Sequence, residues 1–527
     1  MSDNICFPAK LAHSHLKELN ENPEVDRILM PYVVYEHNDD PKNTLNSFNC
    51  PVVSGYSDVI KSVIDLKKPI DSPVINFAQS KALEKQIVDY LKKLGVDRKT
   101  ARKALREALY AQASYSAEIK TKVWEILNQN EEKPRLTILL AGRPYHTDPL
   151  VQHKLSEMIA NLGVNVISED IARGSSDNND AYNSQPETYL VKQWAYMNRI
   201  MKAAQWAAEQ GDNVHFVQMT SFGCGPDSFI QDEIRDIMKR HNKPFTLLKI
   251  DDVSNIGSLK LRVRSLIESL KGVKSEERRV KNSTAEEIQH STLNTQHLQQ
   301  TKVFTKQDVH RKILAPFMTE YLTPIIPPIL KLIGYDVEVL PMSDEASAEI
   351  GLRFANNEVC YPATLIVGDI IKALKSGKYD LKNTAVVMSQ TGGQCRATNY
   401  AGLIKRAMIS NGFQDVPLLT LGVTASTGEA SGSTDDKQDY NEQDGFNVPW
   451  LKYSQIIVTA IFYGDAINEM YNACIARERK QGIAKELRDK YIRLIDEPIA
   501  RNSAKGLIKL LEQAAEEFDQ MTLDREL

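Results

Sequence analysis

Cysteine is the residue type in this sequence whose placement points most directly to chemistry. Four of the six cysteines have a proline one or two positions later, namely Cys6, Cys50, Cys224 and Cys360. Proline is favoured in the first turn of a helix, so we expect each of these sulfurs at a helix N-terminus. Unpaired N–H groups and the positive end of the helix dipole favour thiolate there, and thiolate is the form that binds metal.

The other two cysteines stand in different contexts. Cys395 follows a Gly-Gly turn after an expected strand and precedes Arg396 and a helix, which again predicts a sulfur at a strand-to-helix turn. Cys474 lies inside the uninterrupted helical pattern 465–479. We expect Cys474 to be a small hydrophobic core residue, which is also the alternative role for the other five.

The spacing of the cysteines excludes a local zinc finger, because no Cys-x-x-Cys pair occurs and zinc fingers need such pairs. Thiolates gathered from distant strand ends suit an iron–sulfur cluster held between lobes. Spacing alone leaves structural cysteines open as the alternative.

A second candidate group lies in the segment 142–149, whose sequence is GRPYHTDP. We expect this segment between a strand and a helix, at the sheet edge where α/β proteins bind ligands. Arg143 could hold a phosphate or carboxylate there, and His146 could donate a proton. The alternative is a rigid turn in which Asp148 caps the helix and Pro149 takes its first position.

Composition narrows the class of protein. The 527 residues are 42% hydrophobic and 25% charged, with a net charge of −4, which is typical of a soluble globular protein of several lobes. The balanced charge gives no case for nucleic acid or an anionic membrane as main partner. No apolar run is long enough for a membrane span, and the N-terminus does not resemble a signal peptide. We therefore expect a cytoplasmic protein.

Motifs for two enzyme classes are missing. No phosphate-loop lysine motif occurs, and no Gly-x-Gly-x-x-Gly follows a strand, so we do not expect nucleotide hydrolysis by this chain. No Gly-x-Ser-x-Gly elbow occurs either, which argues against the common α/β-hydrolase arrangement.

The elements that must position these residues follow an alternating pattern. A buried strand is expected at 136–140, followed by a helix at 151–162 and a strand at 164–167, and the rhythm returns after a polar segment. This pattern predicts an α/β fold of two doubly wound, Rossmann-like parallel-sheet lobes. The expected organisation is a first α/β region at 1–271 with a helical insertion at about 79–128, a linker at 272–302, and a second α/β region at 303–527 with a helical C-terminal tail.

The sequence also contains an internal repeat. The segment ICFPAKL at 5–11 returns as VCYPATL at 359–365. The second copy has a helix and a strand before its cysteine, whereas the first copy has only five residues. We therefore expect the first lobe to lack its leading βαβ unit, which another chain would supply.

Several long segments resemble a known family. The segments are ICFPAKLAHSHLKEL, NCPVVSGYSDVI, LLAGRPYHTDPLVQHKL, SFGCGPDSFIQDEI, KIDDVSNIGSLKLRVRSL, NNEVCYPATLIVGDIIKAL and GGQCRATNYAGLIKRA. In order along most of residues 5–420, they resemble the C-terminal part of the large acyl-CoA dehydratase activase-related proteins. These are relatives of the 2-hydroxyglutaryl-CoA dehydratase system, also described as the CoA-substrate-specific enzyme activase family.

The resemblance implies an oxygen-sensitive iron–sulfur protein with a [4Fe-4S] or double-cubane cluster. An actin-like ATPase activase subunit would inject one low-potential electron on ATP hydrolysis, and in the dehydratases this electron makes a ketyl radical of the acyl-CoA substrate, from which water leaves. The resemblance implies a set of cluster ligands in this chain: Cys6, Cys50, Cys224, Cys360 and Cys395. Arg143 and His146 would lie beside the cluster or contact the substrate.

The sequence departs from the family in three ways. It carries no upstream ATPase domains, its first lobe lacks a leading unit, and Tyr32 follows Met30-Pro31 where the family pattern has a cysteine. A truncated or split gene, with a partner chain holding the rest, fits the first two. The alternative function is a non-catalytic scaffold or regulatory subunit, or a split-gene fragment, that binds the ATPase without metal.

Overall fold

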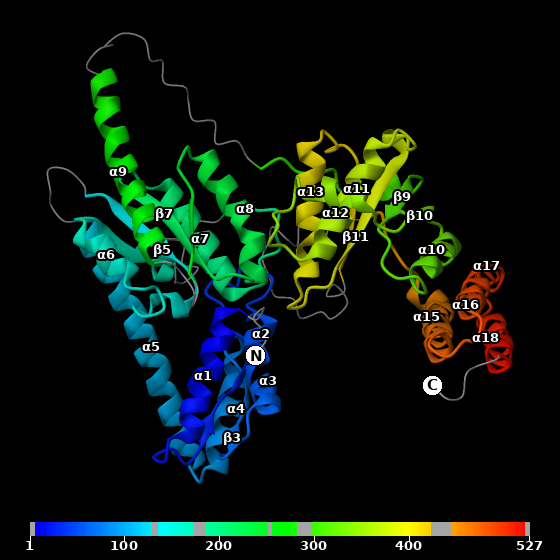
Figure 1. The fold of residues 1–527 in the computed structure, drawn as a ribbon, viewed down its shortest axis with the longest axis horizontal. Coiled ribbons are helices and arrows are strands. Elements are labelled where there is room, and N and C mark those ends of the chain that lie inside the picture. Colours follow the sequence, from blue (N-terminus) through cyan, green and yellow to red (C-terminus); the bar gives the residue numbers. More distant parts are fainter. Residues whose placement is uncertain are drawn as a thin grey trace. The chain divides into compact units, whose positions relative to one another are not determined.

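The protein is described by a computed structural model, in which two compact units are distinguished (Figure 1). The described ranges are 6–128, 135–172, 186–250, 256–281, 298–422 and 444–521. The first unit holds the described residues up to Leu298 together with Gly392–Asn399. The second unit holds Gln299–Thr391 and the remaining described residues from Tyr400 onwards.

The first unit is built around a parallel sheet of strand order β6-β5-β7-β8. Its strands are β5 (Thr137–Ala141), β6 (Asn165–Ser168), β7 (Val214–Thr220) and β8 (Thr246–Lys249). Alternate side chains of these strands pack with α6 (Leu155–Asn161) and α9 (Ile256–Lys281) in one hydrophobic cluster. The helix α7 (Ala195–Glu209) precedes β7 in the chain, and α8 (Gly225–Arg240) precedes β8. These two helices also pack against each other.

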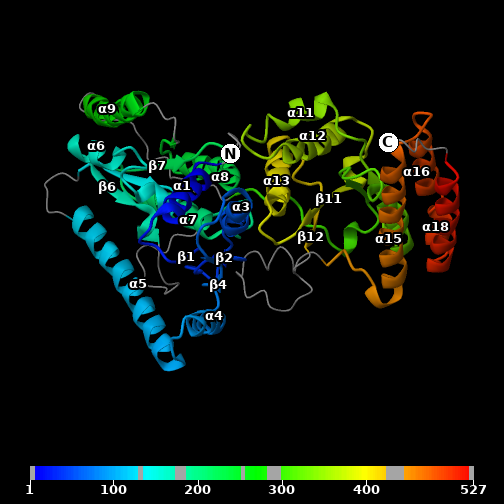
Figure 2. The same cartoon turned by 60° about the horizontal axis from the view of Figure 1, so that its bottom comes forward.

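The N-terminal part of this unit contains shorter parallel pairs, because β1 pairs with β3 and β2 with β4. The strands are β1 (Ile28–Leu29), β2 (Tyr32–Tyr35), β3 (Ile70–Asp71) and β4 (Val74–Asn76), and the helices are α1 (Phe7–Glu21), α2 (Pro51–Ser54) and α3 (Tyr56–Val63). The expected helical insertion is confirmed as α4 (Ser80–Lys93) and α5 (Arg98–Leu127). Figure 2 shows α5 as a long rod with α4 at one end.

The second unit repeats the same topology in a sheet of order β10-β9-β11-β12, also fully parallel. Its strands are β9 (Lys312–Ala315), β10 (Val337–Val339), β11 (Thr384–Gln390) and β12 (Leu418–Gly422). Its sheet-associated helices are α10 (Ile326–Ile333), α11 (Glu345–Gly351), α12 (Tyr361–Lys375) and α13 (Tyr400–Ser410). Two sheets with the same doubly wound order confirm the predicted Rossmann-like α/β fold.

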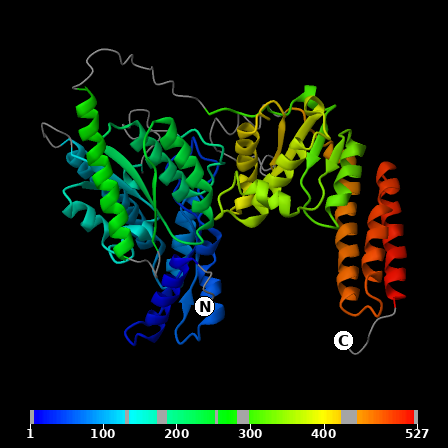
Figure 3. The same cartoon turned by 45° about the horizontal axis from the view of Figure 1, so that its top comes forward.

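The C-terminal tail is helical, as predicted, and packs as a small bundle (Figure 3). Its helices are α15 (Trp450–Ile475), α16 (Ile483–Arg493), α17 (Asp496–Ala500) and α18 (Ala504–Asp519). Cys474 is buried in the core of this bundle, which confirms its predicted core role. None of the helices in the described ranges is long and apolar enough to cross a membrane.

Short 3-10 helices occupy several turns: η1 (Pro144–Thr147), η2 (Glu169–Ala172), η3 (Lys306–Asp308), η4 (Thr323–Ile325), η5 (Leu381–Asn383) and η6 (Arg396–Asn399). One predicted boundary was wrong. The helix expected at 151–162 begins only at Leu155, because His153 and Lys154 adopt the left-handed backbone region. The helix α9 continues to Lys281, so the predicted linker 272–302 starts as helix. Its remainder up to 297 lies outside the described residues. Most of residues 174–186 and 427–445, whose polar sequences predict long loops, lie outside them too.

Gly368 allows α11 and α12 to cross closely, and this contact generates a stability prediction. A Cβ added at Gly368 would lie 1.8 Å from the backbone oxygen of Ser347. Because neither backbone can move cheaply, we expect Gly368→Ala to destabilise the second unit by about 1–3 kcal/mol, measured by urea unfolding. Gly393→Ala is the matched control, since nothing lies within 4 Å of its added Cβ. Equal stability of the two variants would contradict the prediction.

Candidate functional site

Four cysteines occupy helix N-caps, as the Cys-Pro pattern predicted. Cys6 caps α1, Cys50 caps α2, Cys224 caps α8 and Cys360 caps α12, each with proline in the first two helical positions. Backbone N–H groups of the first helical turn act on two of the sulfurs, from Ala9 on Cys6 and from Asp227 on Cys224. Each sulfur thus stands at the N-terminal end of its helix.

Three of these cysteines, all in the first unit, gather around one tyrosine. The half-buried Tyr56 is the first residue of α3. Burial is the largest cause that raises the pKa of Tyr56, and the nearby cysteines Cys6, Cys50 and Cys224 raise it further, whereas Arg143 lowers it. Cys50 also acts electrostatically on Cys6. Sulfurs from three separate helix N-termini thus share one neighbourhood, although they are far apart in sequence.

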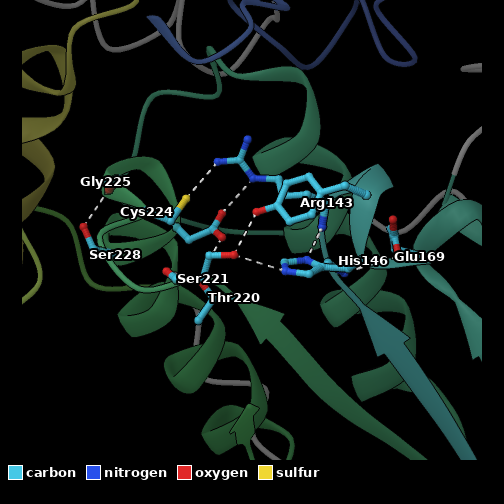
Figure 4. Close-up of polar contacts among 11 residues, drawn as sticks. Arg143, His146, Glu169, Thr220, Ser221, Cys224, Gly225 and Ser228 are labelled. Atoms are coloured by element: carbon cyan, nitrogen blue, oxygen red, sulfur yellow. Dashed lines mark hydrogen bonds and ion pairs between the residues drawn. The ribbon is translucent and has the colours of Figure 1, made fainter. Parts of the chain in front are cut away.

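Arg143 is the cation of this neighbourhood, and it is almost fully buried at 5% exposure. Its Nη2 donates a hydrogen bond to Cys224 Sγ at 3.1 Å, and its Nε donates to Asp227 Oδ1 at 3.1 Å (Figure 4). Asp227 also accepts from Thr220 Oγ1 at 2.9 Å. Burial by itself lowers the pKa of Arg143. The nearby Asp227 and, to a smaller extent, Cys224 more than offset this effect and hold the pKa well above its usual range. Arg143 is therefore committed to a carboxylate and a sulfur of its own chain.

His146 lies behind Arg143 and is fully buried. Its Nδ1 accepts the backbone N–H of Arg143 at 3.0 Å, which leaves the proton on Nε2, 3.5 Å from Ser221 Oγ. Burial is the main cause that lowers the pKa of His146 to about 3, so the ring is neutral at physiological pH. The alternative turn also has support, since Asp148 Oδ1 accepts from the backbone N–H groups of Leu150 and Val151, but no helix starts there.

A cavity of about 500 Å³ adjoins His146. Its polar lining near the carboxyl ends of β5 and β6 includes Thr147, Gln152, Ser168 and Asp170, and its apolar lining comes largely from α5 and the sheet. Glu118 and Lys122 of α5 also line it. Cavities of roughly 300–1,000 Å³ are typical of small-molecule sites. The position outside the strand carboxyl ends is where open α/β sheets bind ligands.

Cys395 lies in the segment Gly392–Asn399, which is counted with the first unit. Gln394 connects this segment to the Cys50 region, because its Nε2 donates to Asn49 O at 2.9 Å and to Ser54 Oγ at 2.8 Å. Its backbone oxygen accepts from Trp194 Nε1 at 3.1 Å. Cys395 itself is exposed. The segment therefore brings a fourth cysteine to the side of the Cys50 helix.

The same segment also packs against the Cys224 helix. A Cβ added at Gly225, the residue after Cys224, would lie 2.0 Å from Nη1 of Arg396. Only a residue without a side chain allows Arg396 to approach the start of α8 so closely. The glycine at position 225, directly after Cys224, therefore leaves room for the side chain of Arg396, which directly follows Cys395.

Two further residues named from the sequence are Cys360 and Tyr32. Cys360 belongs to the second unit, where its Sγ is 3.0 Å from the hydroxyl of Tyr400. The hydroxyl of Tyr32 donates a hydrogen bond to Asp58. This hydrogen bond is the largest cause that raises the pKa of Tyr32.

The expectation that helix N-termini favour thiolate is wrong for two of the cysteines. Burial raises the pKa of the Cys6 thiol despite a lowering backbone hydrogen bond from Ala9. Burial likewise raises the pKa of Cys224, and the opposing effect of Arg143 is smaller. Desolvation outweighs the local dipole at both positions, so in the protein alone these sulfurs carry their protons.

The donor set can be tested against the iron–sulfur cluster that the resemblance implies. Across the described residues, no three His, Cys, Asp or Glu side chains stand together closely enough to hold one metal ion. A cluster of four irons binds each thiolate at a different iron, so its ligands lie farther apart than those of a single ion. Cysteines from three N-caps around one buried arginine fit the soft-sulfur chemistry and negative charge of such a cluster.

Sequence reasoning missed several residues of this site. The missed residues are Tyr56, Asp227 and Gln394. No local motif predicts their contacts, because each of them interacts with residues distant in the chain. Tyr56 does lie six residues after Cys50 within a segment that resembles the family. That proximity was the one available signal.

Comparison with known proteins bears on the N-terminal part of the chain. Residues 1–172 match the family described as the CoA enzyme activase uncharacterised domain. This match spans the N-terminal third of the chain. The match confirms the resemblance to CoA-substrate-specific enzyme activase-related proteins, and it covers α1 to η2, including Cys6, Cys50, Arg143 and His146.

Other comparisons add little. No curated protein matches the chain. The crystal structure of NtrX from Brucella abortus in complex with ATP is 10% identical, over 69% of this chain and 79% of that chain, with a TM-score of 0.18. That score is too low to indicate a shared fold.

The buried Arg143–Asp227 pair generates a prediction about stability. Arg143→Met leaves the Asp227 carboxylate buried without its cation, and we expect a loss of about 3–5 kcal/mol in unfolding free energy. The double variant Arg143→Met/Asp227→Asn should recover part of this loss, measured by urea denaturation. Arg27→Met is the control, because solvent screens its exposed ion pair with Asp71 and we expect little loss of stability. If the double variant lost as much stability as Arg143→Met and Asp227→Asn lose separately when added together, the two residues would not be coupled.

Gln394 generates a second prediction. Gln394→Ala removes two donated hydrogen bonds, so we expect about 1–3 kcal/mol less protection of residues 392–399 and 49–54, measured by amide hydrogen exchange. Gln414→Ala is the control, since Gln414 is exposed and its recorded bond uses only the backbone oxygen. Unchanged exchange in both segments would show that Gln394 does not hold them together.

Proposed function

We propose that this chain is an iron–sulfur component of the 2-hydroxyacyl-CoA dehydratase/activase type. It accepts a low-potential electron from an ATP-dependent, actin-like activase partner, in the cytoplasm, where free cysteines persist. One observation carries the proposal: Cys6, Cys50 and Cys224, from three helix N-termini, share Tyr56 and Arg143 as electrostatic neighbours. The match of residues 1–172 to the family described as the CoA enzyme activase uncharacterised domain supports it.

The proposed ligands in the first unit are Cys6, Cys50, Cys224 and Cys395. Cys360, in the second unit, is the fifth candidate from the sequence. When bound, a [4Fe-4S] or double-cubane cluster supplies one-electron redox chemistry. The chain supplies thiols, which lose their protons on binding metal, and a partly buried environment around Cys6, Cys50 and Cys224, whereas Cys395 is exposed.

Arg143 has a defined part in this proposal. Its Nη2–H already points to a cysteine sulfur, and hydrogen bonds to sulfur are among the factors that set the reduction potential of a cluster. Asp227 holds the guanidinium in place through Nε. The permanent positive charge favours thiolate and an electron-rich cluster over their protonated or oxidised forms.

The cavity beside His146 favours a dehydratase-like role over electron transfer alone. A protein that only relays electrons needs no cavity of about 500 Å³ next to a buried, neutral imidazole. His146 keeps its proton on Nε2 and can donate it in a hydrogen bond to a carbonyl or hydroxyl oxygen. We propose the acyl part of an acyl-CoA as the occupant, with His146 orienting it.

Cluster binding is the central prediction of this proposal. After anaerobic reconstitution, Cys6→Ala, Cys50→Ala and Cys224→Ala should each lose most of the bound iron and change the EPR signal of the reduced protein. Each removes a thiolate that the cluster needs. Cys474→Ala should bind as much iron as the unchanged protein, because Cys474 is buried in the separate C-terminal helix core.

Two results would contradict the proposal. One is failure of the unchanged protein to retain iron after reconstitution. The other is equal iron loss from Cys474→Ala and the three N-cap variants, which would indicate general unfolding. If metal-free protein bound the activase and no iron were retained, the chain would act as a scaffold or regulatory subunit instead.

A further inference from the structure

We propose that the first unit carries a second binding site, for a small organic molecule bearing two or more phosphate groups. The site is a groove of about 630 Å³ between α6 and α9, two helices that lie near each other on one side of the sheet (Figure 2). Its volume falls within the range of roughly 300–1,000 Å³ typical of small-molecule sites. None of the proposed cluster ligands lines it.

The groove is positively charged. Lys154, Lys260 and Arg264 line it, and Glu157 is its one carboxylate. Within the described ranges none of these three cations has an ion-pair partner, unlike Lys271 on the same helix, which pairs with Glu268. Unpaired Lys and Arg side chains facing one groove attract a multiply charged anion, and Arg matches the geometry of phosphate oxygens.

The turn that supplies Lys154 to the groove is strained. His153 and Lys154 have φ values of 53° and 56°, a left-handed conformation that side chains other than glycine rarely adopt. The Lys154 N–H donates to Pro149 O at 2.7 Å, which closes the turn. Two consecutive strained residues with long side chains, where glycine would fit without cost, are a pattern found at ligand-binding turns.

The groove also has an apolar part, which distinguishes an organic phosphate from an inorganic one. Leu150 is 78% exposed and Ile256 is 42% exposed, and Met158 and Leu162 lie beside them. Covering these side chains with an aromatic or aliphatic group would remove apolar surface from water. The combination of unpaired cations and uncovered apolar groups fits a nucleoside diphosphate better than free phosphate. Because the chain lacks a phosphate-loop motif, we infer binding without hydrolysis.

Calorimetry on the full chain at low salt tests this inference, with ADP and inorganic pyrophosphate as probes. We expect ADP to bind more tightly than pyrophosphate. Lys260→Ala and Arg264→Ala should each weaken ADP binding about tenfold, the effect of losing one charge-assisted hydrogen bond of roughly 1.4 kcal/mol. Lys271→Ala, on the same helix but outside the groove, should leave the affinity unchanged.

Lys154→Gly separates binding from folding. Glycine adopts positive φ without strain, so this variant should melt no lower than the unchanged protein and yet bind ADP more weakly. Absence of ADP binding, or equal affinity in all four variants, would overturn the inference. Pyrophosphate binding as tightly as ADP would overturn the apolar part, and binding of anionic lipid vesicles without ADP binding would overturn the small-molecule class.

Discussion

The candidate site depends on one buried ion pair, between Arg143 and Asp227. An arginine that is almost completely removed from water needs a partner of opposite charge, because an unpaired buried cation is very costly. Asp227 supplies that charge from the first turn of α8, and Thr220 at the end of β7 fixes the carboxylate by a hydrogen bond. The remaining guanidinium N–H groups are then held beside the cysteines, where Cys224 accepts one of them. The α/β sheet therefore determines where the positive charge of the site stands.

The two units show how one topology can present cysteines repeatedly. Cys224 follows the third strand of the β6-β5-β7-β8 sheet, and Cys395 follows the third strand of the β10-β9-β11-β12 sheet. The sequence repeat at Cys6 and Cys360 corresponds to two 15-residue helices with the same Cys cap and early proline. In each case the cysteine marks the step between a loop or strand and a helix, where backbone N–H groups are unpaired. The candidate cysteines therefore come from the same local arrangement, a cysteine at the start of a helix, repeated along the chain, and not from one continuous motif.

Much of this arrangement was predictable from the sequence, and the rest was not for physical reasons. Cys-Pro spacing identified the helix N-caps, because proline and helix starts are coupled locally, and the breaker-free pattern around Cys474 identified a core position. The protonated state of Cys224 was not predictable, because burial depends on distant segments. The late start of α6 was not predictable either, because nothing in the residues His153 and Lys154 announces a left-handed turn. Tyr56 and Gln394 were missed because their partners are set by the tertiary fold alone.

The segment Gly392–Asn399 has a consequence for how the protein matures. It is synthesised between β11 and α13 of the second unit, yet it packs with residues near the N-terminus. The ribosome therefore releases the early part of the molecule long before Gln394 and Cys395 exist to join it. During that interval Cys6, Cys50 and Cys224 have been synthesised and Cys395 has not. Cutting the polypeptide between Leu298 and Gln299 would therefore separate Gln394 from its hydrogen-bond partners Asn49 and Ser54.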